Sequence, residues 1–198
     1  MFDHYGLEPN TIDFIGHAVS LYTDESFMSL PATKVIDKIK LYMDSMGRYG
    51  DSPFIYPIYG LGGIPEGFSR ISAVNGGTFM LNTDINEILF EGGKVVGIKS
   101  GEETAKCNLL ICDPTYVTNC GLKDRVKLVD RVIRCICILD HPIPNTENVP
   151  SVQIIIPQRQ IGRKNDIYIM MVSDVHSVSK KGTYIAIIST TVETQNPE

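Results

Sequence analysis

The residues whose spacing is most suggestive of chemistry are the glycines of YGLGGIPEGFSRISAVNGGTFMLN, Tyr59 to Asn82. Such turns can hold a phosphate against backbone N–H groups where G-x-G-x-x-G joins a strand to a helix. Gly60 and Gly62 have this spacing, but Pro65 takes the place of the third glycine, and no Gly-Lys-Ser/Thr follows. We therefore expect no cofactor-binding residues here. The stretch is a scaffold that presents residues to a partner, or a purely structural segment.

Other chemistry has little support in the sequence. The histidines His4, His17, His141 and His176 are scattered, and no G-x-S-x-G, H-x-x-x-H or kinase motif is present. Asp174 and His176 could belong to a triad, but their spacing along an extended chain is more typical of a packing or surface histidine. Catalytic groups can converge from distant positions, so this argument lowers the expectation of an enzyme without removing it. We expect no catalytic residues.

The five cysteines also give no metal-binding or disulfide pattern. Their number is odd, and no C-x-x-C occurs among Cys107, Cys112, Cys120, Cys135 and Cys137. We interpret them as buried, reduced thiols of a cytosolic protein. Two of them, Cys135 and Cys137, should share one face of an apolar strand.

The bulk composition limits the partners. The net charge is -5, the pI is near 5.4, and no run of Lys or Arg is present, so we expect no nucleic-acid groove and no polybasic membrane patch. No apolar run is long enough to span a bilayer, and no signal peptide or Asn-x-Ser/Thr acceptor is present. A chain of 198 residues with 43% hydrophobic content can form one domain or two small ones.

The first fifty residues have helical periodicity. Asn10 is expected to cap a first helix, with an apolar stripe formed by Ile12, Ile15, Ala18, Val19 and Tyr22. Pro31 is expected to open a second helix that ends at Gly47 and has a stripe of Val35, Ile36, Ile39, Tyr42, Met43 and Met46. These stripes could form a plain core or enclose an apolar ligand.

The glycine-rich stretch itself predicts a third helix. Pro65 suits the first helical position, and Gly76 with Gly77 suits the end. One face would carry the apolar residues Ile64, Phe68, Ile71 and Val74. A strand is expected from Thr78 to Leu81.

The rest of the chain has strand periodicity. Gly92-Gly93 predicts a hairpin between Ile85–Phe90 and Lys94–Ser100, with Glu102 and Glu103 in the next turn and further strands within residues 105–112. Later β-branched runs are Val132–Leu139, Val152–Ile156, Ile167–Val172 and Tyr184–Thr190. We therefore predict an α/β (α+β) chain: a helical subdomain in residues 1–52, followed by a mixed, sheet-rich region in residues 53–198.

Several blocks resemble the Rab GDP-dissociation inhibitors, within the family that also contains the Rab escort proteins. IYPIYGLGGIPEGFSRISAVNGGTFMLN is similar to their Rab-contacting block, and DFIGHAVSLY and IKLYMDSMGRYGDSPFIYP to their helical domain and mobile effector loop. The similarity continues through ICDPTY, QIIIPQ and YIAIISTTVET. The resemblance implies part of a fold like that of FAD/NAD(P)-binding proteins. It also implies a central fragment, which fits the abrupt ends of the chain.

The resemblance implies two sets of site residues. A Rab-binding platform would use Arg70, Thr78, Phe79 and Met80, with Phe79 standing where a tyrosine is common and Gly63 where the family usually has a glutamate. A mobile effector loop would span residues 48–54, including Arg48, Tyr49 and Phe54. Residues 1–46 would belong to the lipid-binding helical domain.

The implied function is that of a cytoplasmic regulator that is transiently peripheral on membranes. It would bind GDP-bound Rab GTPases and their geranylgeranyl lipid, slow GDP release and recycle Rabs in vesicle traffic. No cofactor or metal is implied. The alternatives are a Rab escort protein, a flavin-dependent oxidoreductase of related fold and a plain structural module.

Overall fold

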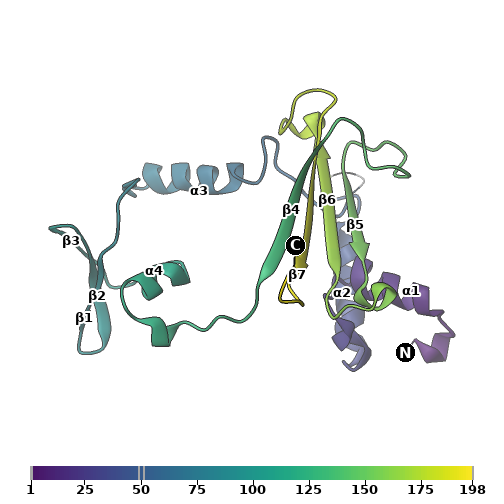
Figure 1. Cartoon of the computed structure of the whole chain (residues 1–198), viewed down its shortest axis with the longest axis horizontal. Coiled ribbons are helices and arrows are strands. Elements are labelled where there is room, and N and C mark those ends of the chain that lie inside the picture. Colours follow the sequence, from purple (N-terminus) through teal and green to yellow (C-terminus); the bar gives the residue numbers. More distant parts are fainter. Residues whose placement is uncertain (1, 49, 51, 198) are drawn as a thin grey trace. The chain divides into compact units, whose positions relative to one another are not determined.

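The computed structural model describes residues 2–48, 50 and 52–197. Contacts divide the chain into two compact units, Met1–Phe68 with Asp130–Glu198, and Ser69–Val129 (Figure 1). Each unit is described by itself below. The expected division after residue 52, with a lipid-binding part before it, stays a prediction.

The first unit contains a four-stranded antiparallel sheet in the order β4-β7-β6-β5. The strands are β4 (Val132–Leu139), β5 (Val152–Ile156), β6 (Ile167–Ser173) and β7 (Tyr184–Thr191). In the two central strands, Met171 pairs with Ala186, and both side chains are buried. All four strands were predicted to within one residue at each end, because β-branched runs bounded by turn residues specify short strands well.

Helices near the N-terminus supply the second part of this unit. They are α1 (Pro9–Asp13), a wider π-helical segment (Phe14–Val19) and α2 (Ala32–Ser45), with short turns at Asp3–Tyr5 and Glu25–Met28. Their core is formed by Phe2, Ile12, Phe27 and Val35. The ring of Phe27 makes edge-on contacts with Phe2 and His17, at centroid distances of 6.0 and 5.6 Å. Figure 1 shows α1 and α2 beside the β5 and β6 side of the sheet.

The predicted start of the first helix was wrong. Pro9 is its first residue and Glu8 precedes it, so Asn10 lies inside the helix and does not cap it. Proline is favoured at this position because its missing N–H would have had no partner there. The helix widens after Asp13, where the Ser20 N–H donates to the Ile15 carbonyl at 2.8 Å.

The second helix begins directly after Pro31, as predicted, and ends at Ser45, just before the expected end at Gly47. Only part of its predicted apolar stripe is covered. Val35 is buried, whereas Ile36, Met43 and Met46 are about half exposed. The helix therefore uses one edge of the stripe for the core and leaves the other edge accessible.

The second unit contains a three-stranded antiparallel sheet and a short helix. The strands are β1 (Glu87–Glu91), β2 (Lys94–Ser100) and β3 (Glu103–Lys106), in that order, and the helix is α4 (Pro114–Asn119). The hairpin turn at Gly92-Gly93 is confirmed: both residues have positive φ, 57° and 79°, which suits a right-twisted two-residue connection. Asp113 caps α4 by accepting a hydrogen bond from the Thr115 N–H.

Three predictions failed around this sheet. Thr78–Leu81 lies outside any helix or strand, residues 107–112 form no strand beyond β3, and Glu103 begins β3 instead of lying in the turn. β-branched composition predicts an extended backbone, but a strand also needs a paired neighbour, which a local pattern does not reveal.

The prediction of buried thiols was also wrong. Cys112 and Cys135 are exposed, and the other three cysteines are half-buried. Cys135 lies on β4, an edge strand that leaves most of its side chains accessible. It does share a face with Cys137, because the two sulfur atoms lie 3.6 Å apart.

Candidate functional site

Helix α3 (Gly63–Val74) presents an uncovered apolar face. All twelve residues of α3 are described, and none of them is buried. Exposed fractions range from 48% to 78% for the apolar residues Ile64, Phe68, Ile71 and Val74. An amphipathic helix normally buries such a face, so an exposed one is a candidate for binding a partner.

The start of α3 differs slightly from the prediction. The helix begins at Gly63, two residues before Pro65, which therefore lies within the first turn. Backbone N–H groups of the first turn have no partner inside the helix, so proline is tolerated there. Gly63 is thus the first helical residue of the predicted platform and carries no side chain to contact a partner.

The end of α3 fixes the direction of the segment that follows. Gly76 has a φ of 89°, and the Gly77 N–H donates to the Ser72 carbonyl at 2.9 Å, as is typical of a glycine-terminated helix. Thr78, Phe79 and Met80 come directly after this turn and are exposed. The turn thus fixes where the three consecutive side chains of Thr78, Phe79 and Met80 begin, and this exposed segment is called the arm below.

Arg70 lies next to the apolar face. It precedes Val74 by four residues, so the two side chains are neighbours on the helix surface. The predicted platform residues therefore occur along one continuous exposed segment, from Gly63 to Met80. In the second unit, Thr78 and Met80 also line a hollow of about 730 Å³, together with Ile88, Ile98 and Tyr116 among others.

The predicted effector loop is only partly described. Arg48 is exposed, Phe54 is about half exposed, and Tyr49 lies outside the described residues. Phe54 packs edge-on against Tyr42 of α2 at 6.1 Å and lines a small hollow of about 220 Å³ that includes Leu41. It also borders a second hollow, of about 500 Å³, whose lining includes Val152 of β5.

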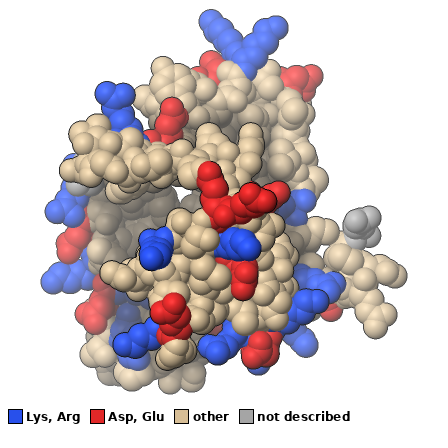
Figure 2. Space-filling view, turned by 90° about the vertical axis from the view of Figure 1, so that its left-hand side faces the viewer, with Lys and Arg blue, Asp and Glu red and all other residues tan. Residues whose placement is uncertain are grey.

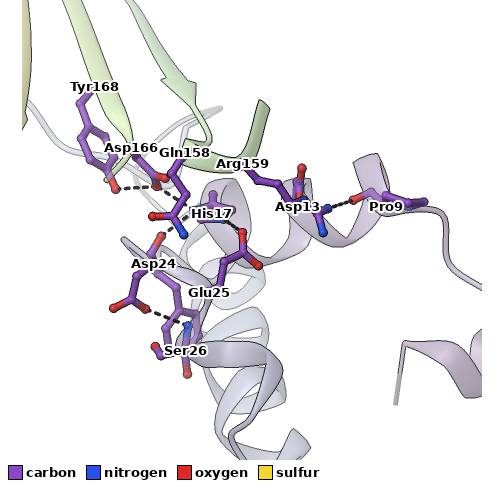
Figure 3. Close-up of polar contacts among 11 residues, drawn as sticks. Pro9, Asp13, His17, Asp24, Glu25, Ser26, Gln158, Arg159, Asp166 and Tyr168 are labelled. Carbon is purple, nitrogen blue, oxygen red and sulfur yellow. Dashed lines mark hydrogen bonds and ion pairs between the residues drawn. The ribbon is translucent and has the colours of Figure 1, made fainter. Parts of the chain in front are cut away.

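A buried polar cluster joins the helical segment to the sheet within the first unit (Figure 3). His17 is 1% exposed, and its Nδ1 lies 2.7 Å from Oδ2 of Asp166. Asp13 is equally inaccessible and accepts a hydrogen bond of 2.6 Å from the Arg159 guanidinium. Glu25 approaches His17 from the other side, with 3.6 Å between Oε1 and Nε2.

Tyr168 completes the edge of the cluster. Its hydroxyl donates to Asp166 at 3.2 Å. Burial, reinforced by the negative charge of Asp166, raises the pKa of Tyr168 well above its usual value. Tyr168 is therefore a neutral hydrogen-bond donor at physiological pH.

Sequence reasoning missed this cluster. Asp13 and His17 are four residues apart on a helix, which places them on one face and was a usable signal. Asp166 lies 149 residues from His17, and no local pattern connects them. The other histidine considered, His176, packs edge-on against Tyr56 at 5.3 Å, in agreement with a packing role.

The surface charge is mixed. On the face shown in Figure 2, the acidic and basic side chains of the described residues are interspersed and do not form a continuous basic patch. A nucleic-acid groove normally has such a patch. Among the described residues, no helix is both long enough and apolar enough to cross a membrane.

Comparison with known proteins decides the family. Residues 1–198, the whole chain, match the family described as GDI: GDP dissociation inhibitor. The chain belongs to the GDI family. The family description names an inhibitor of GDP dissociation, which is a regulatory role and agrees with the expectation of a non-enzyme.

Two curated relatives are similar along the whole chain. Rab GDP dissociation inhibitor beta of Canis lupus familiaris is 52% identical and that of Rattus norvegicus 53% identical, each over 198 residues. The match covers 100% of this chain and 43% of each relative. The chain thus spans less than half the length of these GDI family members.

A solved structure confirms the fold. The crystal structure of Rab GDI from Plasmodium falciparum matches with a TM-score of 0.93 and 55% sequence identity, over 99% of this chain and 44% of that chain. The predicted combination of helices and a mixed, sheet-rich α/β region is therefore confirmed as a GDI family fold. The roles of individual platform and loop residues stay predictions.

Proposed function

We propose that the protein to which this chain belongs binds Rab GTPases in their GDP form, slows GDP release and recycles prenylated Rabs between membranes and cytosol. The observation that carries the proposal is identity of 52% and 53% along the whole chain to proteins named Rab GDP dissociation inhibitor beta. In this proposal the protein is cytoplasmic and only transiently peripheral on membranes.

The proposed Rab-contacting surface is the exposed segment from Gly63 to Met80. Its composition supports this role, because aromatic residues, methionine and arginine are enriched in protein interfaces. Phe79 and Met80 would supply apolar contacts, and Arg70 a charged one beside the apolar face of α3. Gly63 contributes no side chain, so one polar contact that is usual in the family would be missing.

Selectivity for GDP would come from the shape of the GTPase. Switch segments of GTPases are ordered by the γ-phosphate and change when it is lost. A surface complementary to the GDP-state switches binds that state better, and linkage then requires that it also retains GDP on the GTPase. No catalytic group is needed for this effect.

Extraction from membranes would need an apolar site for the lipid. Each buried methylene of a lipid chain contributes about 0.8 kcal/mol in the bilayer, so a binding site must recover most of that free energy. The half-exposed apolar edge of α2 and the hollow beside Leu41, Tyr42 and Phe54 support a lipid-contacting role for this region. The proposed loop residues Arg48, Tyr49 and Phe54 would contact the C-terminal tail of the Rab.

The test is a hybrid protein. The 198 residues replace the corresponding segment of the rat relative, and binding to prenylated Rab loaded with GDP or GTP is measured by titration. We expect a clear preference for the GDP form and slower GDP release from the bound Rab. A hybrid that binds both forms equally, or neither while the parent rat protein binds, would contradict the proposal.

Variants of the hybrid test the surface. Arg70→Ala and Met80→Ala should each weaken binding to GDP-loaded Rab by about tenfold or more, the size of an interface hot spot. Arg125→Ala is a matched control, because Arg125 is also an exposed arginine of the second unit but lies outside the proposed surface. Affinity unchanged by both platform substitutions would show that the surface lies elsewhere.

A further inference from the structure

The orientation of His17 is fixed by two acceptors. Its Nδ1 lies 2.7 Å from the Asp166 carboxylate and 3.1 Å from the Tyr22 carbonyl oxygen. Both partners can only accept there, so Nδ1 carries the hydrogen. The lone pair of a neutral ring must then be on Nε2.

The Nε2 lone pair faces another acceptor. Oε1 of Glu25 lies 3.6 Å from Nε2, beyond hydrogen-bond distance, and both atoms are buried and have no hydrogen-bond partner among the described residues. Two buried acceptors that face each other are unfavourable, because each keeps the cost of its lost hydration. A positively charged species between them would remove this cost.

The acidic side chains of the cluster favour a cation beside His17. The carboxylates of Asp13, Asp166 and Glu25 surround the ring, and Asp13 and Asp166 are 3% and 2% exposed. The Arg159 guanidinium is bound to Asp13, and the nearby ammonium of Lys38 lies over the Tyr22 ring, 3.7 Å from its centroid. Asp13 is paired with Arg159, and the Glu25 side chain is 33% exposed, so Asp166 is the buried carboxylate of this cluster that has no cationic partner among the described residues while His17 is neutral. Buried charges need compensation.

We propose that this cluster is a divalent metal site. The ligands are Nε2 of His17 and carboxylate oxygens of Glu25 and Asp13, and the ion is a first-row divalent cation such as Zn²⁺ or Mn²⁺, which accept imidazole and carboxylate ligands. A divalent ion would offset the negative charge of these carboxylates.

The distances suit this assignment. The three donor atoms lie within 4.8 Å of one another, and the 3.6 Å between Nε2 and Oε1 is close to the roughly 3.4 Å that ligands about 2.1 Å from a tetrahedral ion would have. Where separations within the group approach 4.8 Å, a side-chain movement or an intervening water molecule would complete the set. Its bond to Arg159 uses Oδ1 and leaves Oδ2 as the metal ligand.

The hydrogen-bond partners of His17 Nδ1 are also typical of a metal-binding histidine. Such histidines usually donate their second N–H to a carboxylate or carbonyl, which fixes the ring and makes the ligating nitrogen more basic. Asp166 and the Tyr22 carbonyl occupy this place. Because Asp166 immediately precedes β6, the ion would connect the helical segment to the sheet and stabilise the first unit.

The test uses metal ions alone with the 198-residue chain. Mn²⁺ is the primary probe because it prefers oxygen ligands and so avoids the five cysteines. Its binding is followed by loss of the electron paramagnetic resonance signal of free Mn²⁺, with Zn²⁺ as competitor, and the unfolding temperature is measured with and without Zn²⁺. We expect one Mn²⁺ per chain, displacement by Zn²⁺, and a higher unfolding temperature with Zn²⁺.

The decisive comparison is between two charge-removing variants. Glu25→Gln should lower Mn²⁺ affinity by about tenfold or more and abolish the Zn²⁺-dependent rise in unfolding temperature. Glu8→Gln is the control: Glu8 is an exposed residue of the same helical region whose side chain makes no capping bond, and it should behave like the wild type.

Three results would overturn the proposal. They are a wild-type chain that binds no Mn²⁺ or Zn²⁺, equal binding by the wild type and Glu25→Gln, and a nitrogen-15 NMR spectrum that shows His17 Nε2 still protonated at saturating Zn²⁺. In each case the imidazolium ring, and not a metal ion, would supply the positive charge between the two acceptors. None of these three results depends on Rab binding, so this test and that of the proposed function fail independently.

Discussion

At the scale of single residues, Glu193 makes folding stability depend on pH. Its Oε1 accepts hydrogen bonds from the backbone N–H groups of Lys164 and Asn165, at 3.0 and 2.8 Å, and from the Asn165 side chain. Burial raises the pKa of this carboxyl, but these hydrogen bonds and the nearby Arg163 outweigh burial and lower it below its usual 4.5. A lowered folded-state pKa contributes stability above the unfolded-state pKa, and this contribution is lost as pH falls through the folded-state value.

We therefore expect Glu193→Gln to lower the free energy of unfolding at pH 7 and to have a diminishing effect as pH falls below 4.5. Urea unfolding followed by circular dichroism across this range measures the difference. Glu147→Gln, at an exposed loop position of the same unit, is the control and should change little at any pH. A constant deficit for Glu193→Gln at every pH would show that the carboxylate charge is not responsible.

Gly16 tests the packing of the core. A Cβ placed on this residue would lie within 2.7 Å of three ring carbons of Phe27, which is 1% exposed. Overpacking of this kind costs about 1–3 kcal/mol. We expect Gly16→Ala to lower the free energy of unfolding by that amount in urea titrations, whereas Gly62→Ala, where a Cβ meets no atom within 4 Å, should be close to neutral.

These residues also show what could be predicted at this scale. Arg70, Phe79 and Met80 were identified by family resemblance, and the structure places them on exposed chain, although their contact with a GTPase stays a prediction. The His17 cluster was missed because its partners come from opposite ends of the chain. A sequence shows helical spacing, such as that of Asp13 and His17, but it does not show which strand will pack against the helix.

At the scale of elements, the end of α3 controls the direction of Thr78 to Met80. Gly76 has a positive φ that costs an L-residue roughly 1–2 kcal/mol. We expect Gly76→Ala to fray the last turn of α3, seen as faster amide exchange at Gly76 and Gly77, and to weaken Rab binding of the hybrid by severalfold. The surface residues themselves would be unchanged.

Gly67→Ala is the matched control for this prediction. Gly67 lies within the same helix, a Cβ there meets no atom within 4 Å, and alanine is a better helix former by about 1 kcal/mol. It should slow exchange in α3 without changing the direction of the arm, so it should weaken Rab binding less than Gly76→Ala does. Equal effects of the two substitutions on binding would show that affinity responds to any change in α3 and not to the direction of the arm.

Element prediction succeeded where local chemistry is decisive. The Gly92-Gly93 hairpin and the strands β4 to β7 follow from turn residues and β-branched runs alone. It failed where the outcome depends on partners: Thr78–Leu81 has strand composition but is not paired with any strand of the second unit, and the start of α1 depended on Pro9 and not on Asn10. Likewise, which edge of the α2 stripe stays exposed depends on the elements that pack beside the helix.

At the scale of the whole molecule, the two units differ in how well they are packed. Within residues 69–129, all of which are described, Ile88 is the one hydrophobic residue counted as buried, whereas the first unit buries Phe27, Val35, Met171 and several others. A small sheet with little buried apolar surface is marginally stable. Native-state opening should therefore begin in the second unit.

Hydrogen exchange of backbone amides tests this difference in the 198-residue chain. Both β2 and β7 are central strands that are paired on each side, so their hydrogen bonding is comparable. We expect amides of β2 to exchange about tenfold faster or more than those of β7, because the opening free energy of a region follows the apolar contacts that it buries. Ile88→Ala should speed exchange in β2 further and leave β7 unchanged. Similar protection of the two strands would mean that the chain opens as one cooperative unit, whatever the difference in its cores.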